Sequence, residues 1–306
     1  MLLTVAICTY NNAKLLADTL ESLCTLEVDP KIDRQILIVN NNCTDDTDRV
    51  IATYSGRIDH LTGVHESRQG LSYARNRALK EAKGDYVCFL DDDVVVDPRW
   101  LNGVAAAFDR YQADIVGGRS YLILPCDKPA WFYPELEILL SKLDYGSRPL
   151  IGTNKELFGL NFAVKKQTAL RLGGFKDTLG RKGKLLLSGE EKEFQKRVIA
   201  EGGKCVYQPE ALVGHVVAPG RMKKKWFLKR VFYGELGARQ TGEIHDPLLP
   251  TLVQTTKCLL GLIKSIIIRD CDASRFFHKQ MVTAVFIGRV ISHLGGPVNH
   301  PPSTRG

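Results

Sequence analysis

Continuous apolar segments of strand length alternate with segments of helical period through the first ninety residues. The apolar segments span residues 3–8, 36–39 and 86–90, and segments of helical period lie at 13–26 and 72–82. A strand that is apolar at every position is buried on both faces, whereas a half-exposed strand alternates apolar with polar residues. The pattern therefore predicts an α/β fold in which helices cover both faces of a mainly parallel sheet.

Polar clusters follow three of the predicted strands directly, at residues 9–12, 40–42 and 91–93. Ligands of such sheets bind at the carboxyl ends of the strands, so we expect these clusters to share one site. The residues at 91–93 are three consecutive aspartates, which repel one another unless a cation is present. A hard divalent cation that bridges to phosphates fits this cluster. A solvated acidic turn is the alternative.

Charged residues also open two predicted helices. Residues 70–76 begin one of them and include Arg75, and a helix N-terminus favours phosphate. Glu190 and Glu191 begin another helix, predicted over 190–200. Their carboxylates suit acid–base chemistry if they reach a substrate hydroxyl. The alternatives are that Arg75 is a solvated surface residue and that the two glutamates only complement the helix dipole.

Eight motifs occur in the order found in family 2 glycosyltransferases, which the chain resembles over about residues 3–217. The resemblance implies the GT-A fold of nucleotide-diphospho-sugar transferases, with a Rossmann-like, mixed but mainly parallel sheet. Each motif alone is weak, whereas eight in order are specific. The motifs are VAICTYN (5–11), VNNNCTDDT (39–47), GLSYARN (70–76), FLDDD (89–93), FGLNFA (158–163), GGF (173–175), GEE (189–191) and GH (214–215).

The resemblance implies a set of residues that bind the sugar donor. In the family's pattern an Asp usually contacts the base where this chain has Asn40. The Asn carbonyl can still accept from N3–H of uracil and its amide can donate to O4, so a UDP-sugar is the favoured donor. The implied donor-binding residues are Thr9, Tyr10, Asn11, Asn40, Asp45, Arg75, Asn76 and Asp92.

The resemblance also implies a metal site and a general base. Asp91 and Asp93 would form the DxD pair that holds Mn²⁺ or Mg²⁺, with His215, following a strand, as third ligand. Glu191 aligns with the Asp of the family's catalytic Glu-Asp pair, and Glu190 is the alternative base because both positions are Glu here. The expected activity is inverting, metal-dependent transfer of a sugar from a nucleoside-diphosphate sugar to a hydroxyl. The acceptor would be a saccharide or a lipid-linked molecule, in bacterial-type polysaccharide or glycolipid biosynthesis.

The C-terminal third differs from the rest of the chain. The net charge of +8 favours an anionic partner, and basic residues gather at 221–230 around Trp226 and Phe227. We predict a catalytic domain over 1–218 and a C-terminal helical region with a loose tail over 219–306. The basic-aromatic stretch and the C-terminal helices predict contact with the inner leaflet of a membrane, with Trp226 and Phe227 inserting beside the basic residues. A helical lid or a dimer surface is the alternative. Helical period is found at 248–268 and 276–294.

Other functional classes fit less well. No Gly-x-Gly-x-x-Gly follows the first strand, which disfavours a dehydrogenase. The non-enzymatic alternatives are a catalytically silent nucleotide-sugar-binding protein and, less favoured, a basic nucleic-acid-binding or membrane-surface protein. We expect no nucleic-acid partner, because no nucleic-acid motif is present. Eight cysteines without a CxxC spacing predict reduced core thiols, and with no signal-peptide pattern at the N-terminus this predicts a cytoplasmic location.

Overall fold

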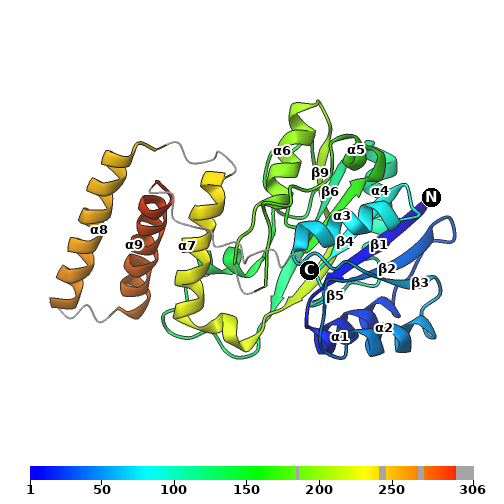
Figure 1. Ribbon diagram of the computed structural model, residues 1–306, viewed down its shortest axis with the longest axis horizontal. Helices are drawn as coiled ribbons and strands as arrows, with labels where there is room; N and C mark the ends of the chain where they lie inside the picture. Colours follow the sequence, from blue (N-terminus) through cyan, green and yellow to red (C-terminus); the bar gives the residue numbers. More distant parts are fainter. Residues whose placement is uncertain (184–185, 241–245, 268–271, 294–306) are drawn as a thin grey trace, which may run out of the picture.

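The computed structural model describes residues 1–183, 186–240, 246–267 and 272–293, and a mixed sheet lies at its centre (Figure 1). Its nine strands in the described residues have the order β3-β2-β1-β4-β8-β6-β9-β5, and β7 pairs with β9. The strands are β1 (Leu2–Thr9), β2 (Asp33–Asn40), β3 (Leu61–His65), β4 (Tyr86–Leu90), β5 (Val94–Val96), β6 (Ile115–Ile123), β7 (Leu150–Ile151), β8 (Asn161–Lys165) and β9 (Cys205–Val216).

The first four strands form the parallel half of the sheet, as the alternating pattern predicts. β1 pairs in parallel with both β2 and β4, and β3 extends the same half. β8 runs antiparallel to β4 and β6, while β6 and β9 are parallel. The sheet is therefore mixed but mainly parallel on the side where the polar clusters follow β1, β2 and β4.

Helices cover both faces of the sheet, and alternate residues of β1 contact opposite faces. Leu3, Val5 and Ile7 pack with α1, α2 and α4, whereas Ala6 packs with α3, α5 and α6. Since both faces are buried, every residue of β1 from Leu3 to Ile7 is without solvent exposure. The helices are α1 (Ala13–Leu23), α2 (Thr47–Ser55), α3 (Leu71–Glu81), α4 (Trp100–Tyr111), α5 (Lys166–Arg171) and α6 (Glu190–Ala200).

Three helices follow the sheet in the chain and extend to one side of it, with α9 between α7 and α8 (Figure 1). Their bounds are α7 (Lys224–Gln240), α8 (Leu248–Ile267) and α9 (Ala273–His293), after the 3₁₀ helix η2 (Pro219–Met222). A second 3₁₀ helix, η1 (Pro134–Leu140), lies in the long segment before β8 and shares an apolar cluster with α7 and α9. The predicted C-terminal helical extension is thus present and packs on the sheet region. The predicted loose tail lies outside the described residues.

The predicted insertion of Phe227 into a membrane is wrong. Phe227 is 0% exposed and stacks edge-on against Trp131 and Phe277, which lie far from it in the sequence. Trp226 is partly buried and packs against Phe227. Among the described residues no helix is long and apolar enough to span a membrane.

The predicted core thiols are only partly found. The seven described cysteines are free, and Cys88 and Cys205 are buried in the sheet as expected. Cys24 and Cys126 are exposed, because they lie just after α1 and in the loop that follows β6. Cys271 lies outside the described residues.

Candidate active site

A cavity of about 570 Å³ opens at the carboxyl ends of β1 and β4. The N-terminal residues of α3 and α6 line it, and residues of α7 form its far wall. Because α7 comes from the C-terminal helices, both parts of the chain contribute to one site. The predicted site residues in its lining are Thr9, Tyr10, Asn11, Arg75, Asp91, Asp92, Asp93, Glu190 and Glu191.

The aspartates after β4 have three different environments. Asp92 accepts hydrogen bonds from Thr9 (2.6 Å) and from the Asn12 amide (2.8 Å), so it ties the end of β1 to the end of β4. Burial raises the pKa of Asp92 to about 7, and the charge of Asp93 adds to this. Burial and Asp93 likewise raise the pKa of Asp91. The cluster therefore carries unfavourable negative charge that a cation would relieve.

Asp93 is the aspartate that remains most readily ionised. Burial alone would raise its pKa, but the hydrogen bond and charge of His215 and the charge of Arg221 outweigh burial and lower the pKa to about 2. Its Oδ2 lies 3.3 Å from Nε2 of His215 and 3.1 Å from Nη2 of Arg221. Its Oδ1 is buried and has no hydrogen-bond partner. One carboxylate oxygen is thus engaged by two side chains, and the other has no hydrogen-bond partner among the described residues.

His215 lies within β9 rather than after it, which corrects the predicted position, and it faces Arg221. Its Nδ1 donates to the carbonyl of Leu140 at 2.7 Å. Its Nε2 lies 2.9 Å from Nη1 of Arg221 as well as facing Asp93. The guanidinium of Arg221 therefore contacts both His215 and Asp93. Across the described residues, no three His, Cys, Asp or Glu side chains are grouped so as to hold a metal ion.

Arg75 is a buried cation among three carboxylates rather than a solvated surface residue. Its Nη1 lies 2.9 Å from Oε1 of Glu190 and 3.9 Å from Oε2 of Glu191, and its Nη2 lies 3.9 Å from Asp91. A Cβ atom at Gly159 would lie only 2.3 Å from Nη2 of Arg75. Only glycine at position 159 therefore leaves room for the guanidinium in this position.

The two glutamates at the start of α6 differ in access and in partners. The Glu190 side chain is 4% exposed and forms the ion pair with Arg75. The Glu191 side chain is 16% exposed, and its Oε1 accepts from the backbone N–H of Gly159 at 3.3 Å. Its Oε2 is buried without a hydrogen-bond partner. Oε2 of Glu190 is likewise buried without a hydrogen-bond partner. Glu191 is therefore distinguished from Glu190 by its greater exposure and by its longer distance from Arg75.

The burial of Glu190 predicts a pH-dependent stability. Burial raises its pKa from 4.5 to about 8, with the charge of Glu191 adding to the effect. A carboxyl whose pKa is raised on folding stabilises the protein below the unfolded pKa, and this stabilisation is lost as the pH rises through the folded pKa. We expect the urea midpoint to fall between pH 5 and pH 8, and to fall less in Glu190→Gln. Identical pH profiles for the two proteins would contradict this.

The family-model comparison decides the classification. The model described as glycosyl transferase family 2 matches residues 4–170, which include β1 to β4, the aspartate cluster and β8. The chain belongs to glycosyl transferase family 2.

Curated relatives of this family 2 glycosyltransferase carry transferase or biosynthesis names. The chain is 24% identical over 237 residues to a glucosyl-dolichyl phosphate glucuronosyltransferase of Haloferax volcanii, covering 76% of this chain and 75% of the relative. It is 26% identical over 250 residues to the succinoglycan biosynthesis protein ExoM of Rhizobium meliloti, covering 80% and 74%.

Solved structures share the GT-A fold with this glycosyltransferase at low sequence identity. The mannosyltransferase PcManGT from Pyrobaculum calidifontis, in complex with GDP-Man and Mn²⁺, aligns with a TM-score of 0.65 at 17% identity, over 96% of this chain and 86% of that one. S. aureus TarS 1–349 in complex with UDP-GlcNAc aligns with a TM-score of 0.55 at 14% identity, over 98% and 93%. The expected GT-A fold is confirmed.

Two predicted donor residues of the glycosyltransferase lie outside the cavity lining. The amide of Asn40 donates to Asp48 at 2.6 Å, and its carbonyl accepts from the backbone N–H of Cys43 at 2.8 Å. Asp45 accepts a hydrogen bond from the backbone N–H of Ala13 at 2.9 Å and another from the hydroxyl of Thr47. Both side chains therefore shape the loop after β2, and a contact of either with a donor stays a prediction.

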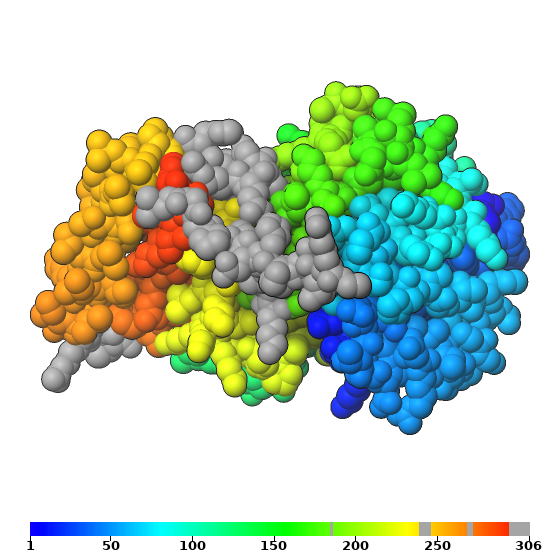
Figure 2. All heavy atoms as spheres, in the orientation of Figure 1, coloured from blue at the N-terminus to red at the C-terminus, as the bar shows by residue number. Residues whose placement is uncertain are grey.

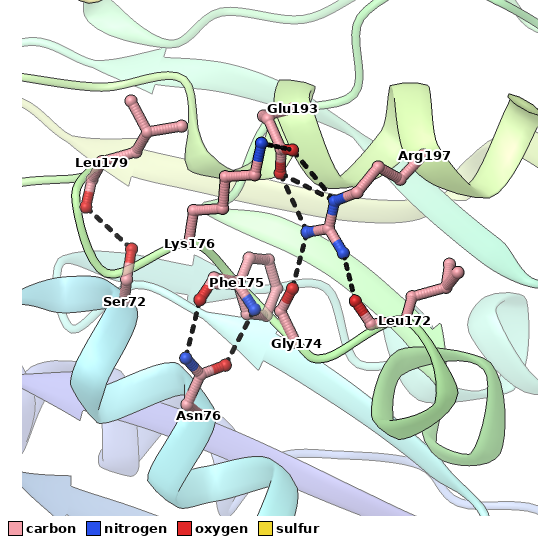
Figure 3. Close-up of polar contacts among 9 residues, drawn as sticks. All are labelled: Ser72, Asn76, Leu172, Gly174, Phe175, Lys176, Leu179, Glu193 and Arg197. Atoms are coloured by element: carbon pink, nitrogen blue, oxygen red, sulfur yellow. Dashed lines mark hydrogen bonds and ion pairs between the residues drawn. The ribbon is translucent and has the colours of Figure 1, made fainter. Parts of the chain in front are cut away.

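Asn76 also lies outside the cavity lining, in the contact between α3 and the turn before α6 (Figure 3). The side-chain NH₂ of Asn76 donates to the carbonyl of Phe175 at 2.7 Å. Its side-chain oxygen accepts from the backbone N–H of the same residue at 2.8 Å. On the α6 side, Arg197 bonds Glu193 and the carbonyls of Leu172 and Gly174. This network fixes α6, and with it Glu190 and Glu191, against α3.

Two arginines of the basic stretch 221–230 line the cavity. Arg221 contacts Asp93, and Arg230 donates to Ser188 Oγ at 2.9 Å beside the start of α6. Burial lowers the pKa of Arg230. The prediction placed this stretch at a membrane because it combines basic and aromatic residues, with a helical lid or a dimer surface as the alternative. Nothing in the local pattern distinguishes these two arginines from the exposed Lys223, Lys225 and Lys229.

Proposed function

We propose that this glycosyltransferase moves a sugar from a nucleoside-diphosphate sugar to a hydroxyl with inversion. The observation that carries the proposal is that Glu191, the more exposed of the two glutamates, lines the same cavity as the aspartate cluster. A carboxylate base and a diphosphate site in one cavity suit a single in-line displacement, in which the acceptor hydroxyl replaces the diphosphate at the anomeric carbon. No covalent intermediate on the enzyme is then required, and positioning supplies much of the rate.

The donor would bind along the carboxyl ends of β1 and β4. Thr9, Tyr10 and Asn11 line the cavity there, and Asp92 is held in place by Thr9 and Asn12. The ring of Tyr10 is exposed and free to pack on a nucleoside. The solved neighbours carry GDP-Man and UDP-GlcNAc, which supports a nucleotide-sugar donor in general. We favour a UDP-sugar.

The aspartate oxygens fit a hard divalent cation. Asp93 Oδ1 is buried without a partner, and burial together with the charge of Asp93 raises the pKa of Asp91 and Asp92. We assign Asp91 and Asp93 to hold Mn²⁺ or Mg²⁺, with His215 as a third ligand once Arg221 is displaced. Such a cation would stabilise the negative charge of the leaving diphosphate.

The residues of the chain itself would perform the proton transfer. Glu191 takes the proton from the acceptor hydroxyl as the hydroxyl oxygen attacks the anomeric carbon and the bond between that carbon and the diphosphate breaks. Beside Glu191, the buried guanidinium of Arg75 forms a close ion pair with Glu190. Glu191 lies farther from that guanidinium. Arg181 and Arg230 line the cavity and add positive charge near the developing phosphate charge.

The acceptor we propose is a saccharide or a lipid-linked molecule, in polysaccharide or glycolipid biosynthesis. The names of the succinoglycan and dolichyl phosphate relatives support these two classes. With a lipid-linked acceptor, the protein would work in the cytoplasm at the inner leaflet of a membrane.

Thermal unfolding with nucleotides tests the donor proposal. UDP, GDP, CMP and dTDP are each added with Mn²⁺ and with EDTA. A ligand that binds only the folded state at 100 times its Kd contributes about 2.7 kcal/mol, which raises the Tm by a few degrees. We expect UDP with Mn²⁺ to give the largest shift and EDTA to remove it. No shift with any nucleotide would contradict the proposal, and a shift with GDP alone would correct the base.

A further inference from the structure

The helix α8 is exposed on its apolar side and buried on its polar side. Thr251, Thr255 and Ser265 are buried, with Thr255 bonding the Phe286 carbonyl of α9. Figure 2 shows α8 at the outer end of the molecule, beyond α9 and α7. The apolar face, hereafter the α8 face, consists of Leu249, Leu252, Val253, Leu259, Leu260, Ile263, Ile266 and Ile267.

The α8 face is unusually exposed for its composition. Leu249 is 73% exposed, Leu260 61% and Ile267 74%. A contiguous apolar surface of this kind marks an interaction site, whereas isolated exposed apolar residues are ordinary. Residues 294–306 offer little to cover it, since they contain only Leu294 and Val298 as large apolar residues.

The charges around the α8 face favour an anionic partner. Lys257 and Lys264 are exposed on α8, and at 100° per residue they lie along one edge of the face. The helix has no Asp or Glu. Of the acidic residues that flank α8 in the described chain, Asp246 pairs with Arg289 at 3.0 Å and Asp272 lies 3.7 Å from Arg275.

We propose that the α8 face docks on the surface of an anionic lipid bilayer, with the helix lying in the interface. The apolar side chains would enter the boundary between headgroups and acyl chains, while Lys257 and Lys264 reach anionic headgroups. A second copy packed face to face would bring lysine-bearing edges together without acidic partners on α8. This inference deepens the proposed action at a membrane and rests on it, and within the C-terminal helical region it assigns the contact to α8 rather than to Trp226 and Phe227.

The test is co-sedimentation of the full chain with vesicles of phosphatidylcholine containing 30% phosphatidylglycerol. We expect binding to these vesicles and weaker binding to pure phosphatidylcholine. Leu260→Gln combined with Ile263→Gln should lower the partition coefficient about a hundredfold, because each buried Leu or Ile contributes about tenfold or more. Lys257→Gln with Lys264→Gln should remove the preference for the anionic vesicles. Leu170→Gln, at an exposed Leu of α5, is the matched control and should bind as the wild type does.

Three results would overturn the proposal. They are absence of binding to either vesicle, unchanged binding of the double Gln variant, and a dimer in solution that this variant dissociates while vesicles are not bound. Ile267→Gln is a milder second variant should the double variant fail to fold. Nucleotide-induced thermal shifts are recorded on the same samples, so a failure of lipid docking is distinguishable from a failure of the donor proposal.

Discussion

Replacing Glu191 with Gln should lower kcat by about 10²–10⁴-fold, the range that a general base contributes. The amide retains the size of the side chain and can still accept the hydrogen bond from Gly159, but it cannot take a proton from the acceptor. Donor binding should be unchanged, because the aspartate cluster is untouched. The measurement is the steady-state rate of transfer, with the nucleotide-induced Tm shift recorded on the same variant.

Glu201→Gln is the matched control for the loss of Glu191. Glu201 follows the same helix at its other end, where it pairs on the surface with Arg171. Its replacement should leave both transfer and donor binding unchanged. Normal transfer by Glu191→Gln together with loss of transfer in Glu190→Gln would reverse the assignment of the base.

Replacing Asp93 with Asn should remove the Mn²⁺-dependent part of nucleotide binding and reduce transfer by about a thousandfold or more, because metal stabilisation of the leaving group amounts to several kcal/mol. The substitution keeps an oxygen that can accept from Arg221 but eliminates the ionised carboxylate. Of the three aspartates, Asp93 is the one whose pKa is lowered, to about 2, so it is ionised at neutral pH. Binding is followed by thermal unfolding at increasing Mn²⁺ concentrations.

The control for Asp93→Asn is the same change at Asp109, which is exposed on α4. Because Asp93 also contacts Arg221 and His215, unfolding without ligand is measured first to separate a loss of stability from a loss of binding. Retention of Mn²⁺-dependent binding by Asp93→Asn would show that the cation is held elsewhere.

The sequence predicted those parts of the fold that depend on local pattern. Residues 36–39 and 86–90 are apolar throughout and residues 3–8 are apolar except for Thr4, and each segment lies in a buried parallel strand. The convergence of Thr9 and Asp92 follows from this, because parallel neighbours bring their carboxyl ends to the same edge of the sheet.

The details that the sequence could not predict depend on contacts between distant residues. Arg221 reaches Asp93 across 128 positions, and Phe227 is buried by Trp131 and Phe277. Asn40 is the opposite case, since its amide is engaged by neighbours within eight residues. An Asn in a polar loop carries no sign of whether its partner is a ligand or the loop itself.

Arg221 and Arg230 have a consequence for how such enzymes diverge. Both arise from the segment after the sheet, yet one neutralises Asp93 and the other supports the segment that leads into α6. A recombination event that exchanged the C-terminal helices between two relatives would therefore replace part of the reaction centre along with the outer surface. The two parts of the chain must vary in concert, and a hybrid gene would need both arginines restored at the junction to regain the original charge balance.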